Sequence, residues 1–296
     1  MKMIVKFNLV FIVVFLIGLA AAATVSHELL QRNAREEIVQ NARLLMESAL
    51  ATRAYTSTQV GPLLQTQMKY AFLPQSVPAY SATEVFNGVR KAFPQYDYKE
   101  ATINPTNPRN RANDWEADIV KQFRAAADRT ELVGERDTPS GRSFYIARPI
   151  EIKAQSCLSC HSTVAAAPRT LVDLYGPANG FGWRLNEIIG AQIVSVPTEV
   201  PIARANAAFQ TFMVSLTLVF ALVFVALNLM LSFMVIRPVS RLSRLADQLS
   251  QGEDIDAPDF EVKGNDEIDV LAQSFNRMKK SLVEAMRMLE APARPT

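Results

Sequence analysis

Cysteine and histidine are scarce in this chain of 296 residues, which holds two of each. A structural zinc site takes about four nitrogen or sulfur ligands, so zinc would need carboxylates or a second subunit to complete its coordination. Cys157, Cys160 and His161 lie together in the stretch "SCLSCH", and the remaining histidine, His27, is far from them in sequence. The scarcity therefore disfavours zinc and directs attention to one short motif.

The chain also lacks any strong excess of one charge. Its 31 lysines and arginines face 29 aspartates and glutamates, and no basic block interrupts the mixture. Proteins that bind nucleic acid carry a clustered basic surface, so we expect no nucleic-acid partner. We find no internal repeat and no low-complexity segment either.

Two long uncharged runs, in contrast, are prominent. Hydrophobic residues make up 49% of the chain, and 19 consecutive uncharged residues run from Phe7 to Val25. A second run of 25 extends from Phe212 to Ile236. Each is long enough to cross about 30 Å of hydrocarbon as a helix. We therefore predict transmembrane helices at residues 7–25 and 209–236. The alternative for the first run is a cleaved signal peptide, since basic residues precede it and alanines end it.

The basic residues next to these runs predict the orientation. Lys2 and Lys6 precede the first run, while Arg237, Arg241 and Arg244 follow the second. Short segments rich in lysine and arginine stay in the cytoplasm. We therefore expect a two-pass protein of a bacterial inner membrane, with residues 1–6 and the C-terminal part in the cytoplasm. Residues 26–208 would form a periplasmic domain.

The pattern of this outer segment mixes helices and strands. Apolar residues at three- and four-residue steps predict a long helix from Ser26 to Thr56, and a proline-rich connection follows it. Later stretches predict, in order, a helix at 82–92, a strand at 96–103, a helix at 115–126, a hairpin with its turn at 138–141, and a closing strand at 180–197. Antiparallel strands surrounded by helices predict an α+β domain, broadly of the PAS type.

After the second run, Pro238 suits the first turn of a helix, and apolar residues repeat at heptad spacing. The longer seam consists of Ile268, Leu271, Phe275, Met278, Leu282, Ala285 and Leu289. Two such helices bury their seams in a parallel four-helix coiled coil that forms when two chains dimerise. With its "DEI" entry and "LAQSFNRM", this segment, 237–290, resembles the HAMP signal-relay domain. The blander alternative is a simple dimerising coiled coil. We expect residues 291–296 to be a disordered tail.

Three kinds of site compete for the CxxCH stretch. Zinc lacks ligands, as described above. A dithiol pair of the thioredoxin type opens a helix in a βαβ unit, whereas this motif follows a strand-like run, and such a pair leaves His161 unexplained. Covalent c-type haem remains, because thiols three residues apart can each reach one vinyl group of the porphyrin, and the next imidazole is then held under the iron. We therefore favour one haem c per chain, attached through Cys157 and Cys160, with His161 as axial ligand.

A family resemblance agrees with this hypothesis. The stretches "VPAYSATEVFNGVRKAFPQYDYKEATINPTNPRNRANDWE", "ARPIEIKAQSCLSCH" and "LYGPANGFGWRLNEIIGAQIVSVP" resemble the Tll-like periplasmic c-type haem sensor domain, long catalogued as a domain of unknown function. The resemblance covers about Arg35 to Pro197. It implies a PAS-like haem sensor, and the ligands Cys157, Cys160 and His161 carry over from the motif.

The sixth position of the iron does not carry over. Candidate ligands are Met46, Met68 and Tyr80, and an open iron is an equal alternative. Met46 falls on the apolar face of a helix, which favours a place in the core, and His27 should lie too close to the bilayer. Arg109 and Arg111 are candidates to face the haem propionates, although loop arginines are more often simply solvated.

The order of the segments predicts a receptor. A change of redox state or the binding of a small gas at the haem would pass through the second membrane helix to HAMP, and from there to a separate cytoplasmic signalling partner. We expect no enzyme activity, because no kinase or other output domain follows the heptads. The alternative is a membrane-anchored monohaem cytochrome for electron transfer. A third class, haem catalysis, would need a distal acid–base group that no second histidine supplies.

Overall fold

The computed structural model describes residues 3–290, except 127, 140, 252–257, 262, 263 and 265, and leaves the side chains of 286, 287, 289 and 290 undescribed. The expected disordered tail and the seam position Leu289 therefore lie outside the described part. The chain divides into two units, one formed by residues 26–209 and the other by the residues before and after them. We describe each unit separately.

A single helix, α1 (Met3–Tyr55), contains both the first apolar run and the polar helix predicted to follow it. Within the unit of residues 26–209, its buried positions recur every three or four residues, at Ala34, Ile38, Ala42, Met46 and Ala49. This periodicity turns one face of α1 toward the core. A π-helical turn (Thr56–Val60) and the short α2 (Gly61–Leu64) continue it.

The proline-rich connection contains more helix than the sequence predicts. It has 3-10 turns at Gln67–Lys69 and Pro74–Ser76, and α3 (Pro78–Ala92) begins four residues before the predicted start. Proline at the first helical position lacks only an N–H that would be unpaired there anyway. Pro74 and Pro78 therefore each begin a helical turn. The proline-rich pattern instead predicts that they interrupt helices.

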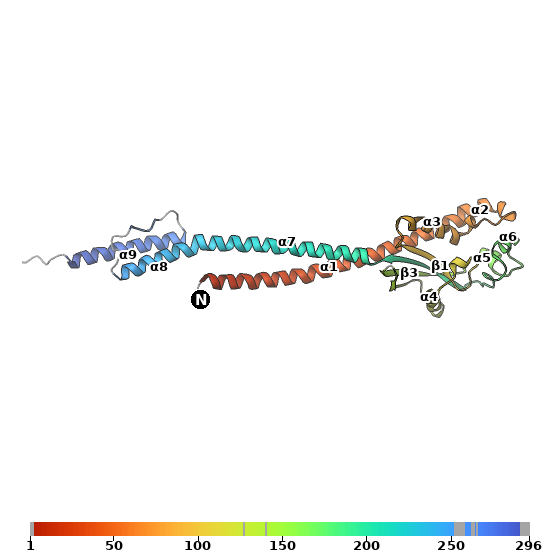
Figure 1. Cartoon of the computed structure of the whole chain (residues 1–296), viewed down its shortest axis with the longest axis horizontal. Coiled ribbons are helices and arrows are strands. Elements are labelled where there is room, and N and C mark those ends of the chain that lie inside the picture. Colours follow the sequence, from red (N-terminus) through yellow and green to blue (C-terminus); the bar gives the residue numbers. More distant parts are fainter. Residues whose placement is uncertain are drawn as a thin grey trace, which may run out of the picture. The chain divides into compact units, whose positions relative to one another are not determined.

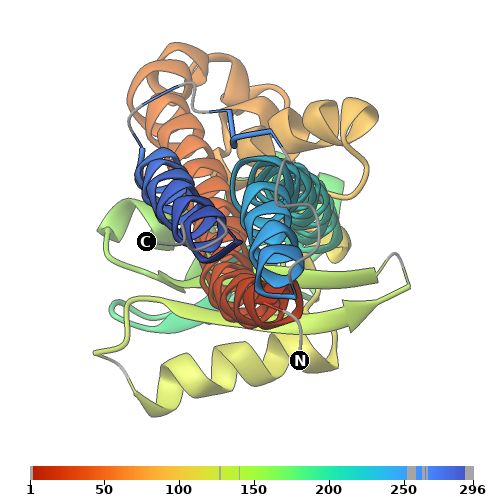
Figure 2. The same cartoon turned by 90° about the vertical axis from the view of Figure 1, so that its left-hand side faces the viewer.

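The sheet has four antiparallel strands in the order β1 (Asp97–Thr102), β4 (Ile188–Pro197), β3 (Gly141–Glu151) and β2 (Leu132–Thr138). Alternating side chains divide its core in two. Phe144, Ile146 and Val194 pack with α1 and α3 on one face, and Ala147 and Ile193 pack with α4 (Asp114–Ala125) on the other. The end-on view shows α4 on one side of the sheet and α3 on the other (Figure 2). The predicted combination of helices with an antiparallel sheet is confirmed.

No loop separates the last strand from the helix that follows. β4 ends at Pro197 and α7 (Glu199–Leu231) begins at Glu199. Thr198 between them is 2% exposed, and its backbone N–H and its hydroxyl both donate to the Arg142 carbonyl, at 3.1 and 2.9 Å. The start of α7 is thus fastened directly to β3.

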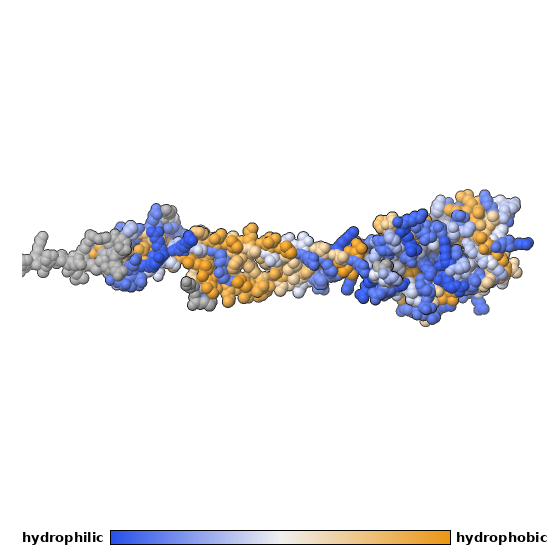
Figure 3. Space-filling model, in the orientation of Figure 1, coloured by the Kyte–Doolittle hydropathy of each residue, from blue (hydrophilic) through white to orange (hydrophobic). Residues whose placement is uncertain are grey.

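The other unit holds both apolar runs as helices, and both are long and apolar enough to cross a membrane. Phe15 of α1 stacks on Phe220 of α7 with ring centroids 5.1 Å apart, and apolar residues cover the surface of both segments (Figure 3). After a second π-helical turn (Ser232–Ile236) come α8 (Arg237–Ser250) and α9 (Glu267–Glu290), seen in Figure 1. Asn276 of α9 pairs with both backbone groups of Phe260 at 2.9 Å, which fastens the connector to α9.

Candidate functional site

The CxxCH motif lies on a short helix, α5 (Gln155–His161), which starts soon after β3. Positions i, i+3 and i+4 share one face of a helix, so Cys157, Cys160 and His161 project together. Both cysteines are free thiols and half-buried. The sequence did not predict this helix, because seven residues with two serines show no helical period. The sheet beside it is antiparallel, unlike the βαβ setting of thioredoxin-type dithiols.

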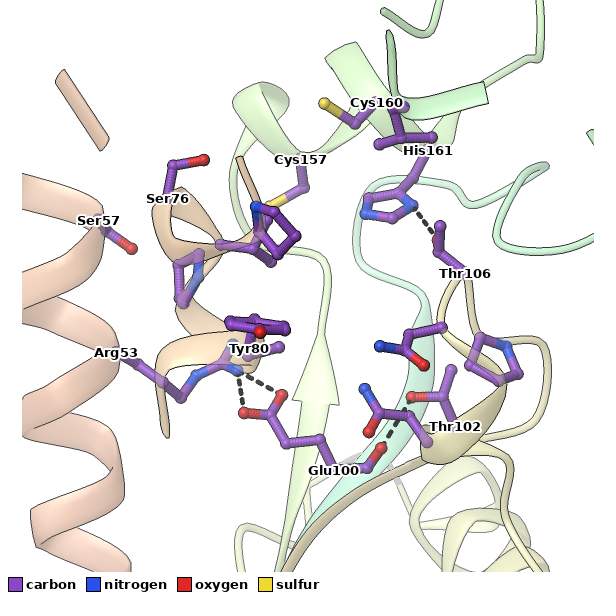
Figure 4. A pocket seen from close by; sticks show the side chains of 18 of the residues that line it. Arg53, Ser57, Ser76, Tyr80, Glu100, Thr102, Thr106, Cys157, Cys160 and His161 are labelled. Atoms are coloured by element: carbon purple, nitrogen blue, oxygen red, sulfur yellow. Dashed lines mark hydrogen bonds and ion pairs between the residues drawn. The ribbon is translucent and has the colours of Figure 1, made fainter. Parts of the chain in front are cut away.

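All three motif residues line one pocket of about 580 Å³. Figure 4 shows the motif on one side of this pocket, with Arg53 and Ser57 on α1 and its π turn on the other. The remaining wall comes from α3, the sheet and the loops beside it, including Met68, Tyr80, Glu100, Thr106 and Trp183. This volume falls within the range of about 300–1,000 Å³ that is typical for sites of small organic molecules.

His161 is held in one orientation. Its Nδ1 lies 2.7 Å from the Gly180 carbonyl oxygen, and since a carbonyl only accepts, Nδ1 carries the hydrogen. Burial lowers the pKa of His161, and this outweighs the hydrogen bond to Gly180, which raises it. The ring therefore favours its neutral form, with a lone pair on Nε2. It also stacks on Trp183, with ring centroids 3.9 Å apart. A neutral imidazole whose other nitrogen donates to a carbonyl is the usual state of a metal-bound histidine.

The segment that orients His161 folds back on the end of α5. Gly182 N–H donates to the Ser162 carbonyl at 2.9 Å, and Trp183 N–H donates to the His161 carbonyl at 3.1 Å. These bonds satisfy carbonyls that a helix end leaves free. Gly180 has φ +84°, and a Cβ there would lie 2.0 Å from the Thr106 hydroxyl oxygen. Only glycine fits this backbone approach. The sequence predicts a strand from residue 180, but β4 begins only at Ile188, and residues 180–183 contact the end of α5 instead.

A buried ion pair forms part of the opposite wall, and sequence reasoning missed it. Arg53 Nη1 contacts both carboxylate oxygens of Glu100, which also accepts from the Tyr98 hydroxyl at 2.8 Å. Glu100 is only 3% exposed. Burial opposes the charge of Arg53, but attraction to Glu100 and the hydrogen bond with it raise the pKa of its guanidinium. Burial and the neighbouring Glu100 raise the pKa of Tyr98 well above its usual value. At neutral pH Arg53 is therefore charged and the Tyr98 phenol is neutral.

The candidate sixth ligands separate clearly. Met46 is fully buried and belongs to the core between α1 and the sheet, as its position on the apolar face suggested. Met68 and Tyr80 line the pocket. The Met68 sulfur, however, accepts from Leu73 N–H at 3.1 Å and from the Ser76 hydroxyl at 3.4 Å. His27 lies against the Phe209 ring, 5.2 Å between centroids, away from the pocket-lining set.

The two candidate arginines also differ. Arg109 lines the pocket, lies over the Tyr80 ring at 4.6 Å and forms an ion pair with Glu84 at 2.5 Å. Arg111 instead donates to the Asn179 side chain at 3.3 Å. Of the two, Arg109 is the one that faces the cavity.

A Tll0287-like domain (31–197), two candidate membrane helices and a HAMP domain (230–284) together indicate a membrane signalling sensor. The chain belongs to the Tll0287-like family, which matches residues 31–197, and residues 230–284 match the HAMP domain. Both resemblances predicted from the sequence are confirmed. A similar solved structure is that of the cyanobacterial heme-protein Tll0287, with 16% identity and a TM-score of 0.42, over 54% of this chain and 95% of that one. No curated protein matches the chain.

Proposed function

We propose that this protein is a membrane-bound c-type haem sensor that passes a redox or small-gas signal through HAMP to a cytoplasmic signalling partner. The observation that carries the proposal is that Cys157, Cys160 and His161 share one face of α5 and line one pocket. The sequence motif alone indicates only that these three residues are close together in the chain. Their common face and the neutral, oriented imidazole are what covalent haem attachment needs in addition.

The residues present fit one haem c per chain. The thiols of Cys157 and Cys160 would form the thioether bonds, and Nε2 of His161 would be the axial ligand. When bound, the haem would supply an iron centre that changes oxidation state or takes a small gas. The protein's own residues orient the ligand: Gly180 keeps the hydrogen on Nδ1, and Trp183 stacks on the imidazole ring.

The path of the signal follows from the connectivity. We propose that residues 26–208 are periplasmic and both termini cytoplasmic, as the basic residues next to the apolar runs indicate. The sensor fold would be PAS-like, and two copies would pair through a parallel HAMP four-helix coiled coil. Thr198 fastens the start of α7 to the sheet, so a shift in the sheet would reach the second membrane helix without a flexible loop. HAMP would act as the two-state element that such coupling needs.

The test is optical spectroscopy of the full chain, expressed with a working cytochrome c maturation system and purified in detergent. We expect a c-type pyridine haemochrome in the native protein and its loss in the Cys157→Ser/Cys160→Ser double variant. His161→Ala should keep the covalent haem but change its coordination spectrum. A native protein that carries no covalent haem would contradict the proposal.

An electron-transfer cytochrome is the second candidate, and one observation favours it. Both cysteines are only half-buried, so the thioether edge of a haem would be partly accessible to a redox partner. Stopped-flow reduction by quinol or a soluble donor separates the two functions. Fast exchange, together with HAMP cross-linking that is identical in oxidised and reduced membranes, would support electron transfer over sensing.

A further inference from the structure

The wall opposite the CxxCH helix is the part of the pocket that the proposed haem ligands leave unexplained. Arg53 and Ser57 are four residues apart on α1 and its π turn, and both side chains point toward the pocket (Figure 4). A π-helical turn inside a long helix often marks a functional position. This wall is polar, although the neighbouring part of α1 presents Ala42, Met46 and Ala49 to an apolar core.

The donors of Arg53 are only partly used. A guanidinium has five N–H groups, and the contacts to Glu100 are made by Nη1 alone. Among the described residues, neither Nε nor Nη2 has a hydrogen-bond partner. The Arg53 side chain is 24% exposed and lines the pocket, so these donors are available to a molecule that occupies it. An unpaired donor in such a place favours a ligand that accepts hydrogen bonds.

The position of Glu100 and Tyr98 explains how the arginine keeps its place. Glu100 lies on β1, holds Nη1 through both oxygens, and is itself held by the Tyr98 hydroxyl. Because both carboxylate oxygens contact Nη1, this end of the guanidinium is anchored to β1. The anchor leaves Nε and Nη2 available to a molecule in the pocket.

Arg53 and Cys157 line the same pocket, and Figure 4 shows them on different walls. Arg109 lines the pocket as well, but its guanidinium lies over the Tyr80 ring and pairs with Glu84.

We propose that Arg53 is the hydrogen-bond donor for a small diatomic ligand that enters the pocket on the side opposite His161, and that Glu100 and Tyr98 position it. This inference rests on the proposed haem function and deepens it. It assigns the sensor a gas whose outer atom carries negative charge when it binds. It also places the donor on α1, the helix that contains the first membrane run, so a ligand that draws Arg53 away from Glu100 changes the contact between α1 and the sheet.

Carbon monoxide is the probe, because its C–O stretching frequency reports the charge next to its oxygen. A nearby N–H donor draws electron density onto the ligand and lowers the frequency. We expect Arg53→Met to raise the infrared C–O frequency of the reduced, CO-treated full chain, and Arg53→Lys, which keeps the charge, to restore part of the shift. Arg111→Met is the control, since it removes a nearby arginine that donates to Asn179 and is not among the pocket-lining residues, and it should leave the frequency unchanged.

Loss of Arg53 alone leaves the buried Glu100 side chain without its ion-pair partner, which destabilises the fold. The double variant Arg53→Met/Glu100→Gln removes both charges together and should show the same upward shift. Circular dichroism and covalent haem content verify that each variant is folded and loaded.

The outcomes are distinguishable. If the native chain carries no covalent haem, the proposed function fails. If haem is present but carbon monoxide does not bind, the far side of the iron is closed, and the role of Arg53 is overturned while haem binding stands. If carbon monoxide binds and neither Arg53→Met nor the double variant changes the frequency, or Arg111→Met shifts it equally, the assignment of Arg53 is wrong.

Discussion

The hydrogen bond between Gly180 and His161 can be tested with a pair of glycine substitutions. Gly180 and Gly182 both have positive φ, +84° and +82°, so alanine at either position pays a similar backbone strain of about 1–2 kcal/mol. A Cβ at Gly182 meets nothing within 4 Å, whereas at Gly180 it would lie 2.0 Å from Thr106 Oγ1 and 2.8 Å from its Cα. Only Gly180→Ala therefore has to move the backbone carbonyl that His161 uses.

The magnitudes follow from these contacts. The unit of residues 26–209 falls in the size range in which 1 kcal/mol shifts Tm by about 2–4 °C. Gly182→Ala should therefore lower Tm by roughly 2–8 °C. Gly180→Ala should lower it further, because the displaced carbonyl also weakens its hydrogen bond with His161 Nδ1, which is worth about 0.5–1.5 kcal/mol.

The assay is thermal unfolding of the full chain in detergent, followed by circular dichroism, together with resonance Raman spectra of the reduced protein. The iron–histidine stretching frequency depends on the Nδ1 hydrogen bond, so it should fall in Gly180→Ala and stay native in Gly182→Ala. Equal Tm values and equal stretching frequencies in the two variants would refute the role given to the Gly180 carbonyl.

Three further predictions concern the other candidates. Met46→Leu should change the free energy of unfolding by less than about 1.5 kcal/mol, and Met46→Ala should lower it by about 2–5 kcal/mol. Both variants should keep the native haem spectrum, and a spectral change in the leucine variant would show that Met46 is a ligand. Met68→Leu should also keep the native haem spectrum, because its sulfur accepts two hydrogen bonds from its own loop. A cysteine at Met278, on the heptad seam, should cross-link two chains more efficiently than one at Lys280, and the yield should differ between oxidised and reduced membranes; equal yields would argue against a HAMP relay.

Local periodicity made most of the helices and strands predictable. Heptad or three- and four-residue spacing indicates a helix in α1 and α9, and a long apolar run indicates a membrane helix. The turn residues at 138–141 between two strand-prone runs indicate a hairpin. The proline-rich connection was misread because proline both breaks a helix and begins one. Which of the two it does depends on packing around Pro74 and Pro78, and the local sequence does not contain that information.

The site was predictable only where its residues are neighbours in sequence. Cys157, Cys160 and His161 form a motif, whereas Arg53 and Glu100 are 47 positions apart and meet only when α1 packs on the sheet. Arg53 in sequence is one charged residue on an amphipathic helix, and Glu100 is one polar residue in a strand. Their pairing is a property of the tertiary structure, so no reading of local pattern could find it.

The single residue between β4 and α7 has a consequence for anyone who wishes to transplant this sensor. Because Thr198 is bonded twice to the Arg142 carbonyl, the first turn of α7 is fixed to the sheet. Each residue inserted after it turns the rest of the helix by about 100° and advances it by about 1.5 Å. A chimaera with a foreign helix should therefore respond periodically to insertions, with its output restored after about seven residues, when two full turns bring the original face back.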